Sequence, residues 1–257
     1  MTLAIIGGSG FDQLPNFAVV EQRKVSTPYG SPSAPLSFGK YCGSKLVFLP
    51  RHGGDHSIAP HRINYRANMY ALKDAGVTEV VALAAVGGIN PDFPARSIVI
   101  PHQIIDYTSA REHTFYDGNL SSNSHASNSH VDDKVNHIDF TEPYDQPLRL
   151  RLIQAAQHMT IEVNNSGVYA VTQGPRLETA AEIDRLERDG AEIVGMTAMP
   201  EAALARELNM RYASIALVVN AAAGRGDQEL TMEIIQANLA ATTDDALAIL
   251  EQFISLF

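Results

Sequence analysis

Cysteine and basic residues are scarce in this chain of 257 residues. Its single cysteine, Cys42, allows no internal disulfide and is typical of a reducing compartment, so we expect a cytoplasmic protein. Only 19 Lys and Arg stand against 29 Asp and Glu, and the net charge of −10 argues against nucleic acid or an anionic membrane surface as partner. No apolar run has transmembrane length, and the apolar start at residues 1–6 lacks a basic leader, which favours a first strand over a signal peptide.

Apolar strand-like runs alternate with segments of helical periodicity along the whole chain. This alternation predicts an α/β fold with a twisted, mixed but mostly parallel central sheet and helices on both faces. No linker is long enough to divide the chain, so we expect one domain over residues 1–257. The expected strands are 3–6, 45–49, 79–86, 97–101, 104–107, 168–172, a run ending at 195–197, and 213–219. The expected helices are 61–75, 147–159, 179–189, 199–208 and 231–255, the last with Thr231 as its N-cap.

Residues 119–136 are rich in Ser, Asn, His and Asp and almost free of apolar side chains. This composition favours a mobile surface loop. A metal site formed by His125, His130 and His137 is the alternative, but no compact ligand set falls on one element. We therefore expect no metal.

Polar clusters follow three of the expected strands at the point where each strand ends. The run 168–172 enters a Gly-Pro turn at 174–175, a second strand ends at Met196 and Thr197, and a third ends at Asn220. An open α/β sheet binds ligands in a crevice at the carboxyl ends of its strands. The sequence therefore predicts a ligand site there.

Three segments could hold a phosphate. In Gly7–Gly10, glycines let backbone amides approach an anion and Ser9 adds a hydroxyl, although a tight turn would need the same residues. Arg51 offers a planar fork and His52 a donor that can charge near neutral pH, and the alternative is a surface arginine beside a structural histidine. The small residues at 84–88 would let a ligand lie against the strand, or would serve close helix packing.

The remaining candidates suit a sugar and a base. Thr197 can donate to an anion or cap the next helix, Met196 can pack on a sugar face, and Glu201 could accept from ligand hydroxyls. Glu178 and Asn220 together match a 6-oxopurine, which presents an N1–H donor and acceptors at O6 and N7. The alternative makes Glu178 a first-turn helix residue and Asn220 a turn former.

These residues recur in order in a known family. The chain resembles the superfamily of trimeric purine nucleoside phosphorylases and methylthioadenosine phosphorylases over essentially its whole length except the polar segment 119–136. The matching segments are Ile5-Ile6-Gly7-Gly8-Ser9-Gly10, Arg51-His52-Gly53, Asn64-Tyr65-Arg66-Ala67-Asn68, Gly174-Pro175-Arg176, Ala181-Glu182, Val194-Gly195-Met196-Thr197 and Pro200-Glu201.

The resemblance implies reversible phosphorolysis: inorganic phosphate attacks C1′ of a purine nucleoside and releases the base and a ribose 1-phosphate. It implies phosphate binding by Ser9, Arg51, His52, Ala85 and Thr197, and ribose binding by Met196. It implies base binding by Leu177, Glu178, Asn220 and Ala222, with Asn220 and Thr197 as the catalytic residues. It also implies a homotrimer with sites at subunit interfaces, phosphate as co-substrate and no other cofactor.

Two departures bear on the substrate. The adenine-using branch has acids where this chain has Asn220 and Ala222, so the resemblance implies hypoxanthine, or guanine, as the base. The 6-oxopurine enzymes place a histidine near the 5′-hydroxyl, where this chain has Met232; an apolar wall suits a methylthio group, unless Met232 is simply core. His137 matches a residue that reaches the neighbouring subunit's 5′ pocket.

The expected substrate is therefore 5′-methylthioinosine, which a bacterial subgroup of the family prefers. Three alternatives stay open: an inosine or guanosine phosphorylase, a methylthioadenosine phosphorylase, and a nucleoside- or phosphate-binding protein without catalysis.

Overall fold

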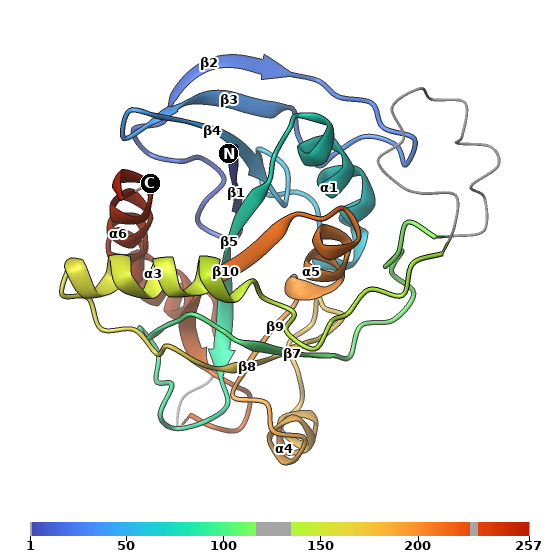
Figure 1. The fold of residues 1–257 in the computed structure, drawn as a ribbon. Coiled ribbons are helices and arrows are strands. Elements are labelled where there is room, and N and C mark those ends of the chain that lie inside the picture. The colour runs from blue at the N-terminus through green and yellow to red at the C-terminus, as the bar shows by residue number, and fades with distance from the viewer. Residues whose placement is uncertain (1, 117–134, 227–230, 257) are drawn as a thin grey trace.

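The computed structural model describes residues 2–116, 135–226 and 231–256, whose strands form one twisted ten-stranded sheet (Figure 1). Its main path runs β2-β3-β4-β1-β5-β9-β8-β7, and β10 pairs with β5 and β6. The strands are β1 Leu3–Gly7, β2 Ala18–Arg23, β3 Leu36–Tyr41, β4 Ser44–Pro50, β5 Glu79–Gly88, β6 Ile98–Val99, β7 Gln103–Asp106, β8 Val168–Val171, β9 Ile193–Gly195 and β10 Arg211–Ala221.

The centre of the sheet is parallel and its antiparallel pairs lie around that centre. Strands β4, β1, β5 and β10 pair in this order and run parallel to one another, and so do β7, β8 and β9. Antiparallel pairing joins β2 to β3, β3 to β4, β6 to β10, and β9 to β5. The expectation of a mixed, mostly parallel α/β sheet is confirmed.

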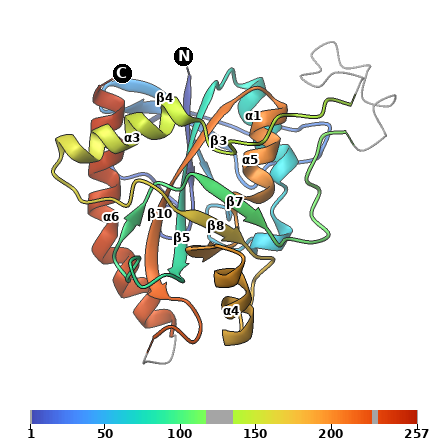
Figure 2. The same ribbon diagram turned by 60° about the horizontal axis from the view of Figure 1, so that its bottom comes forward.

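Helices cover both faces of the sheet, as predicted. In Figures 1 and 2, α3 (Gln146–His158) and α6 (Met232–Ser255) lie on one side, and α1 (Tyr65–Asp74) and α5 (Ala198–Glu207) lie on the other. Alternation along β1 explains this, because Ala4 and Ile6 pack in the cluster with α1 and α5 while Ile5 packs in the cluster with α3 and α6. A fifth helix, α4 (Ala180–Arg188), follows β8.

Local capping chemistry sets where the helices begin. Thr179 caps α4 in a capping box with Glu182, so Glu178 precedes the helix and the alternative of a first-turn helix residue is wrong. Thr231 caps α6 as predicted, accepting from the Ile234 amide. The helix expected at 61–75 begins only at Tyr65, because Asn64 is its N-cap and residues 60–62 form a separate 3-10 turn.

The hairpin edge formed by β2 and β3 was not predicted from the sequence. All six residues of β2 are exposed, so this strand carries no alternation of apolar and polar residues. β3 turns into β4 through Cys42 and Gly43, which have φ of 49° and 81°. Two successive positive φ values are typical of the two-residue turns that join hairpin strands, so Gly43 was a usable turn signal.

Candidate active site

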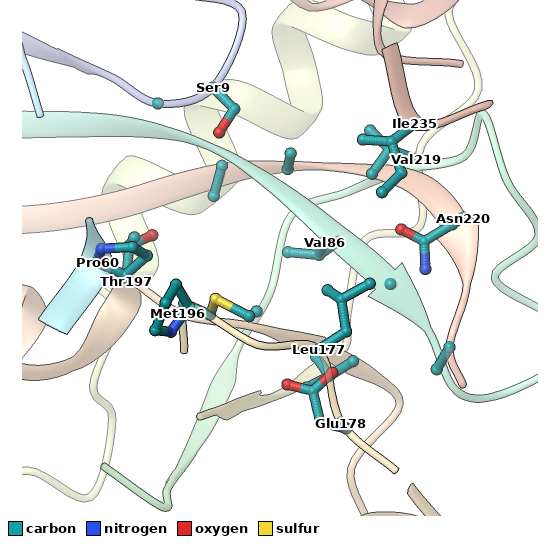
Figure 3. Close-up of a pocket in the computed structure, with 18 of the residues that line it drawn as sticks. Ser9, Pro60, Val86, Leu177, Glu178, Met196, Thr197, Val219, Asn220 and Ile235 are labelled. Atoms are coloured by element: carbon teal, nitrogen blue, oxygen red, sulfur yellow. The ribbon is translucent and has the colours of Figure 1, made fainter. Parts of the chain in front are cut away.

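One cavity of about 240 Å³ collects nearly all the predicted site residues. It lies where β1, β4, β5 and β10 end and where the chain leaves β9 (Figure 3). Its lining includes the predicted residues Ser9, Arg51, His52, Ala85, Leu177, Glu178, Met196, Thr197, Asn220, Ala222 and Met232. Figure 3 shows Ser9 and Thr197 toward one end, Glu178 and Asn220 toward the other, and Met196 between them.

The strand geometry around the cavity differs from the prediction in one respect. The sequence predicts that the strand ending near Met196 shares its carboxyl edge with the other strands of the site. Strand β9 instead runs antiparallel to β5, with Val194 opposite Gly87. The chain leaving β9 therefore passes back along β5 and brings Met196 and Thr197 into the same cavity as Ala84 and Ala85.

The glycine turn after β1 is packed too closely for any other residue at Gly8. A Cβ there would lie 2.3 Å from the Leu83 carbonyl oxygen and 2.9 Å from Arg51 NH1. The turn thus brings the backbone directly against the cavity, and Ser9 follows with its hydroxyl pointing inward (Figure 3). His56 Nε2 lies 3.5 Å from that hydroxyl, and Asp12 bonds the other ring nitrogen of His56 at 2.8 Å.

Arg51 is the one large charged side chain buried at the centre of the phosphate candidates, with only 1% of its surface exposed. Its Nε and NH2 donate to the two carboxylate oxygens of Glu201 at 2.8 and 2.9 Å, and NH1 donates to the Leu83 carbonyl at 2.9 Å. Because the carboxylate neutralises the guanidinium and fixes its plane, the pKa of Arg51 is raised despite burial, which acts to lower it. The alternative of a surface arginine is wrong.

Glu201 binds other protein side chains instead of facing the cavity. It is fully buried, and besides holding Arg51 it accepts from the Tyr212 hydroxyl at 2.8 Å. It does not belong to the cavity lining, so the expectation that it accepts from ligand hydroxyls is wrong. Its place at the start of α5 makes it an internal partner that orients Arg51.

His52 is a neutral imidazole in this site. Burial, with the positive charge of Arg51 as a smaller cause, lowers its pKa to about 4. Nδ1 lies 2.8 Å from the Ile58 carbonyl and therefore carries the proton, which leaves Nε2 as an acceptor. The expectation that this ring charges near neutral pH is wrong; the ring can instead accept from a protonated phosphate oxygen.

Thr197 occupies the N-cap position of α5, but its side chain makes no capping hydrogen bond. The chain bends immediately afterward, since Met199 has non-helical φ and ψ of −116° and 137°. The hydroxyl is consequently not committed to the helix, and Thr197 remains only 7% exposed in the cavity wall. The alternative that the Thr197 side chain caps the next helix is therefore wrong.

The base candidates lie together at the other end of the cavity. Thr172, which directly follows β8, donates from Oγ1 to Glu178 Oε1 at 2.5 Å and so fixes one oxygen of the carboxylate. Asn220 Nδ2 donates to the Ala221 carbonyl at 2.8 Å, which uses one of its two N–H groups. Ala222 is 2% exposed and packs in a small apolar cluster with Ile89 and Ala170.

An apolar wall completes the cavity beside β10. It consists of Val219, Ile235 and Met232, with the first two seen together in Figure 3. Met232 is 60% exposed, so it lies at the rim of the cavity rather than in the core. The alternative that Met232 is simply buried core is wrong.

His137 is exposed and does not line this cavity. The prediction for it concerns a neighbouring subunit, so it stays a prediction. The metal alternative included His125 and His130, which fall outside the described residues along with most of the polar segment. Within the described ranges, no three His, Cys, Asp or Glu side chains are grouped as metal ligands, and no helix has the length and hydropathy to cross a bilayer.

Comparison with known proteins identifies the family. The sequence model of the phosphorylase superfamily matches residues 2–255. The chain belongs to this superfamily. It is 50% identical, over 91% of both chains, to a protein of Pseudomonas syringae pv. tomato named a probable S-methyl-5′-thioinosine phosphorylase. It is 45% identical, over 89% of its own length and 83% of the other, to the 6-oxopurine nucleoside phosphorylase of Pyrococcus furiosus.

The solved structures of the superfamily agree with the fold. Methylthioadenosine phosphorylase from Schistosoma mansoni, in complex with adenine, superposes with a TM-score of 0.91 at 33% sequence identity, covering 100% of this chain and 91% of that one. The predicted enzyme class, a phosphorylase of purine nucleosides, is confirmed by these relatives.

Proposed function

We propose that this superfamily member catalyses the phosphorolysis of 5′-methylthioinosine to hypoxanthine and 5-methylthioribose 1-phosphate. The observation that carries the proposal is the composition of one cavity. A carboxylate and a carboxamide, Glu178 and Asn220, line its base end, and an apolar wall lines its side. Relatives named as probable S-methyl-5′-thioinosine phosphorylases, 50% and 42% identical to this chain, support the same substrate.

The end of the cavity near Ser9 and Arg51 offers hydrogen-bond donors, and the charge of Arg51 is balanced by Glu201. We assign phosphate to Ser9, Arg51, His52, Thr197 and the backbone of Ala85. Arg51 uses three N–H groups on Glu201 and Leu83, so among the described residues two remain to face an anion. Neutral His52 then accepts from a phosphate O–H, which fixes the orientation of the nucleophilic oxygen.

The reaction follows from this placement. A phosphate oxygen forms a bond to C1′ as the C1′–N9 bond breaks, and the bonding pair leaves with the purine. Positive charge develops on the ribose, as in glycosidic cleavage, and the phosphate beneath it stabilises that charge. The free N–H of Asn220 donates to N7 or O6 of the departing base, and Met196 packs along the ribose.

The base end is assigned to a 6-oxopurine. Thr172 holds Glu178 Oε1, and the second carboxylate oxygen accepts from N1–H. Adenine has no N1–H and presents an amino group where Asn220 would donate, so buried groups would be left unpaired. Leu177 and Ala222 supply apolar contact to the ring.

Inosine is the second candidate substrate. Met232 is 60% exposed, so within one chain the apolar wall is open to solvent. A 5′-hydroxyl beside this wall would therefore keep part of its hydration. The Pyrococcus furiosus relative, named a 6-oxopurine nucleoside phosphorylase, matches this possibility. We assign the closing of the 5′ side to His137 of a neighbouring subunit in a homotrimer. We further propose a cytoplasmic enzyme that uses phosphate and no other cofactor.

Phosphorus NMR of a reaction with 5′-methylthioinosine tests the proposed chemistry. A sugar 1-phosphate signal should grow at the rate at which hypoxanthine appears, and omission of phosphate should stop both. Hypoxanthine release without phosphate would mean hydrolysis, and nucleoside binding without cleavage would support a binding protein. Either result would contradict the proposal.

A further inference from the structure

Arg111 is a buried cation that the sequence analysis did not single out. It follows β7, is 8% exposed, and is not part of the cavity lining. It makes six hydrogen bonds to described residues, and all six go to neutral oxygens. Its guanidinium carbon also lies 5.4 Å from the centre of the Tyr65 ring.

These bonds divide between two turns that are far apart in the sequence. NH2 donates to the carbonyls of Thr172 and Gln173 at 3.1 and 2.8 Å, and Nε donates to the Gln173 side chain at 3.1 Å. NH1 donates to the carbonyls of Met196 and Met199 at 2.8 and 2.6 Å. One planar group therefore joins the end of β8 to the turn after β9.

Each turn carries residues of the site. On the first, Thr172 holds the Glu178 carboxylate at 2.5 Å and approaches the Gly195 carbonyl at 3.4 Å. On the second, Met196 leads directly into Thr197. We propose that Arg111 is a positioning residue that fixes the base-binding turn and the phosphate-binding turn relative to each other. The functional part of this inference rests on the proposed roles of Glu178 and Thr197.

The arrangement requires a guanidinium rather than any cation. Its nitrogens point in fixed directions, and the four carbonyls converge on NH1 and NH2 from both turns. A lysine ammonium is one nitrogen with three donors and cannot reach both sets at once. Arg111→Lys therefore keeps the charge but breaks the connection between the two turns, which loosens both of them.

The chain offers a matched control for the structural cost of losing such a side chain. Arg149 in α3 is 4% exposed and donates from Nε to the Pro101 carbonyl at 2.7 Å and from NH2 to the Ile100 and Asn165 carbonyls. It lies outside the cavity lining. Arg149→Lys should thus lower thermal stability without touching the site.

Steady-state kinetics with the nucleoside that the wild type cleaves best distinguishes a positioning role of Arg111 from a purely structural one. Arg111→Lys should raise KM for both phosphate and nucleoside and lower kcat/KM about 10²-fold, the loss expected from a displacement of about 1 Å. Arg149→Lys should leave both KM values unchanged. Arg111→Ala should regain activity with millimolar guanidinium and not with methylammonium. Unchanged KM values in Arg111→Lys, or equal effects of the two lysine variants, would overturn the inference.

Hydrogen exchange tests the tie itself, whatever the substrate. In Arg111→Lys, peptides covering 172–178 and 193–199 should both exchange faster than in wild type, and in Arg149→Lys neither should. Faster exchange in only one turn, or in neither, would overturn the inference even if the enzyme is a phosphorylase. If exchange changes as expected but no nucleoside is cleaved, the proposed function fails and the tie between the turns stands.

Discussion

Among the residues that the structure describes, the ion pair between Arg51 and Glu201 should be the most costly electrostatic contact to break. The two side chains are 1% and 0% exposed, and both carboxylate oxygens receive a donor from the guanidinium. Glu201→Gln keeps the shape, turns one acceptor into a donor facing a donor, and leaves a buried cation unpaired. Removing one partner of a buried pair costs about 3–5 kcal/mol. At roughly 2–4 °C per kcal/mol for a chain of this size, Tm should fall by about 6–20 °C.

Glu182→Gln is the matched control for the same chemical change at the surface. Glu182 also receives two donors from an arginine, Arg176, but the side chains are 43% and 68% exposed. Glutamine at this position preserves the capping box, and exposed pairs contribute about 0–1 kcal/mol, so Tm should move by at most a few degrees.

Thermal melts with and without phosphate complete this test. Phosphate supplies an anion that the Glu201→Gln site lacks, so it should raise Tm more in that variant than in wild type. Equal costs for the two glutamine variants would refute the argument from burial. An equal phosphate effect in wild type and Glu201→Gln would refute the placement of Arg51 against the anion.

Three further predictions concern specificity and pH. Asn220→Asp should lower the ratio of kcat/KM for 5′-methylthioinosine to that for 5′-methylthioadenosine by about 5- to 150-fold, from about 1–3 kcal/mol of mispaired groups. An unchanged ratio would show that Asn220 does not determine which base is bound. The single change is preferable to one that adds Ala222→Asp, because Ala222 is 2% exposed and would bury a second acid. Met232→His should shift preference toward inosine about 5-fold, from about 1 kcal/mol of lost apolar contact, whereas Met159→His, 43% exposed and outside the cavity lining, should shift nothing. The pKa of His52 is lowered to about 4 from an ordinary 6.5, so between these pH values the unfolded chain binds a proton that the folded chain does not, and stability falls as pH falls. Between pH 7.5 and 5 the free energy of unfolding of wild type should fall by about 2 kcal/mol because of this residue. Thermal melts of His52→Asn should not show this loss.

The sequence predicted the sheet, the flanking helices and the lining of the cavity because these follow from local signals. The apolar run of β5, the cap at Thr231 and the polar residues at strand ends are each visible in a few neighbouring letters. Strands without such a signal were missed, and β2, exposed along its whole length, is the example.

What the sequence could not supply were contacts between distant segments. The pairing of Arg51 with Glu201 spans 150 positions, and the bonds of Arg111 join segments 61 to 88 positions apart. Burial then changed chemistry that side-chain type alone suggests: His52 became neutral and Glu201 became an internal partner. The direction of β9 was likewise undetermined, because a short apolar strand reads the same in either orientation.

The decisive measurement is phosphate-dependent base release from four nucleosides in parallel: 5′-methylthioinosine, 5′-methylthioadenosine, inosine and adenosine. We expect the highest kcat/KM for 5′-methylthioinosine and lower values for both adenine nucleosides than for their hypoxanthine counterparts. Preference for inosine would contradict the assignment of the apolar wall to a methylthio group. Preference for 5′-methylthioadenosine would contradict the reading of the base by Glu178 and Asn220.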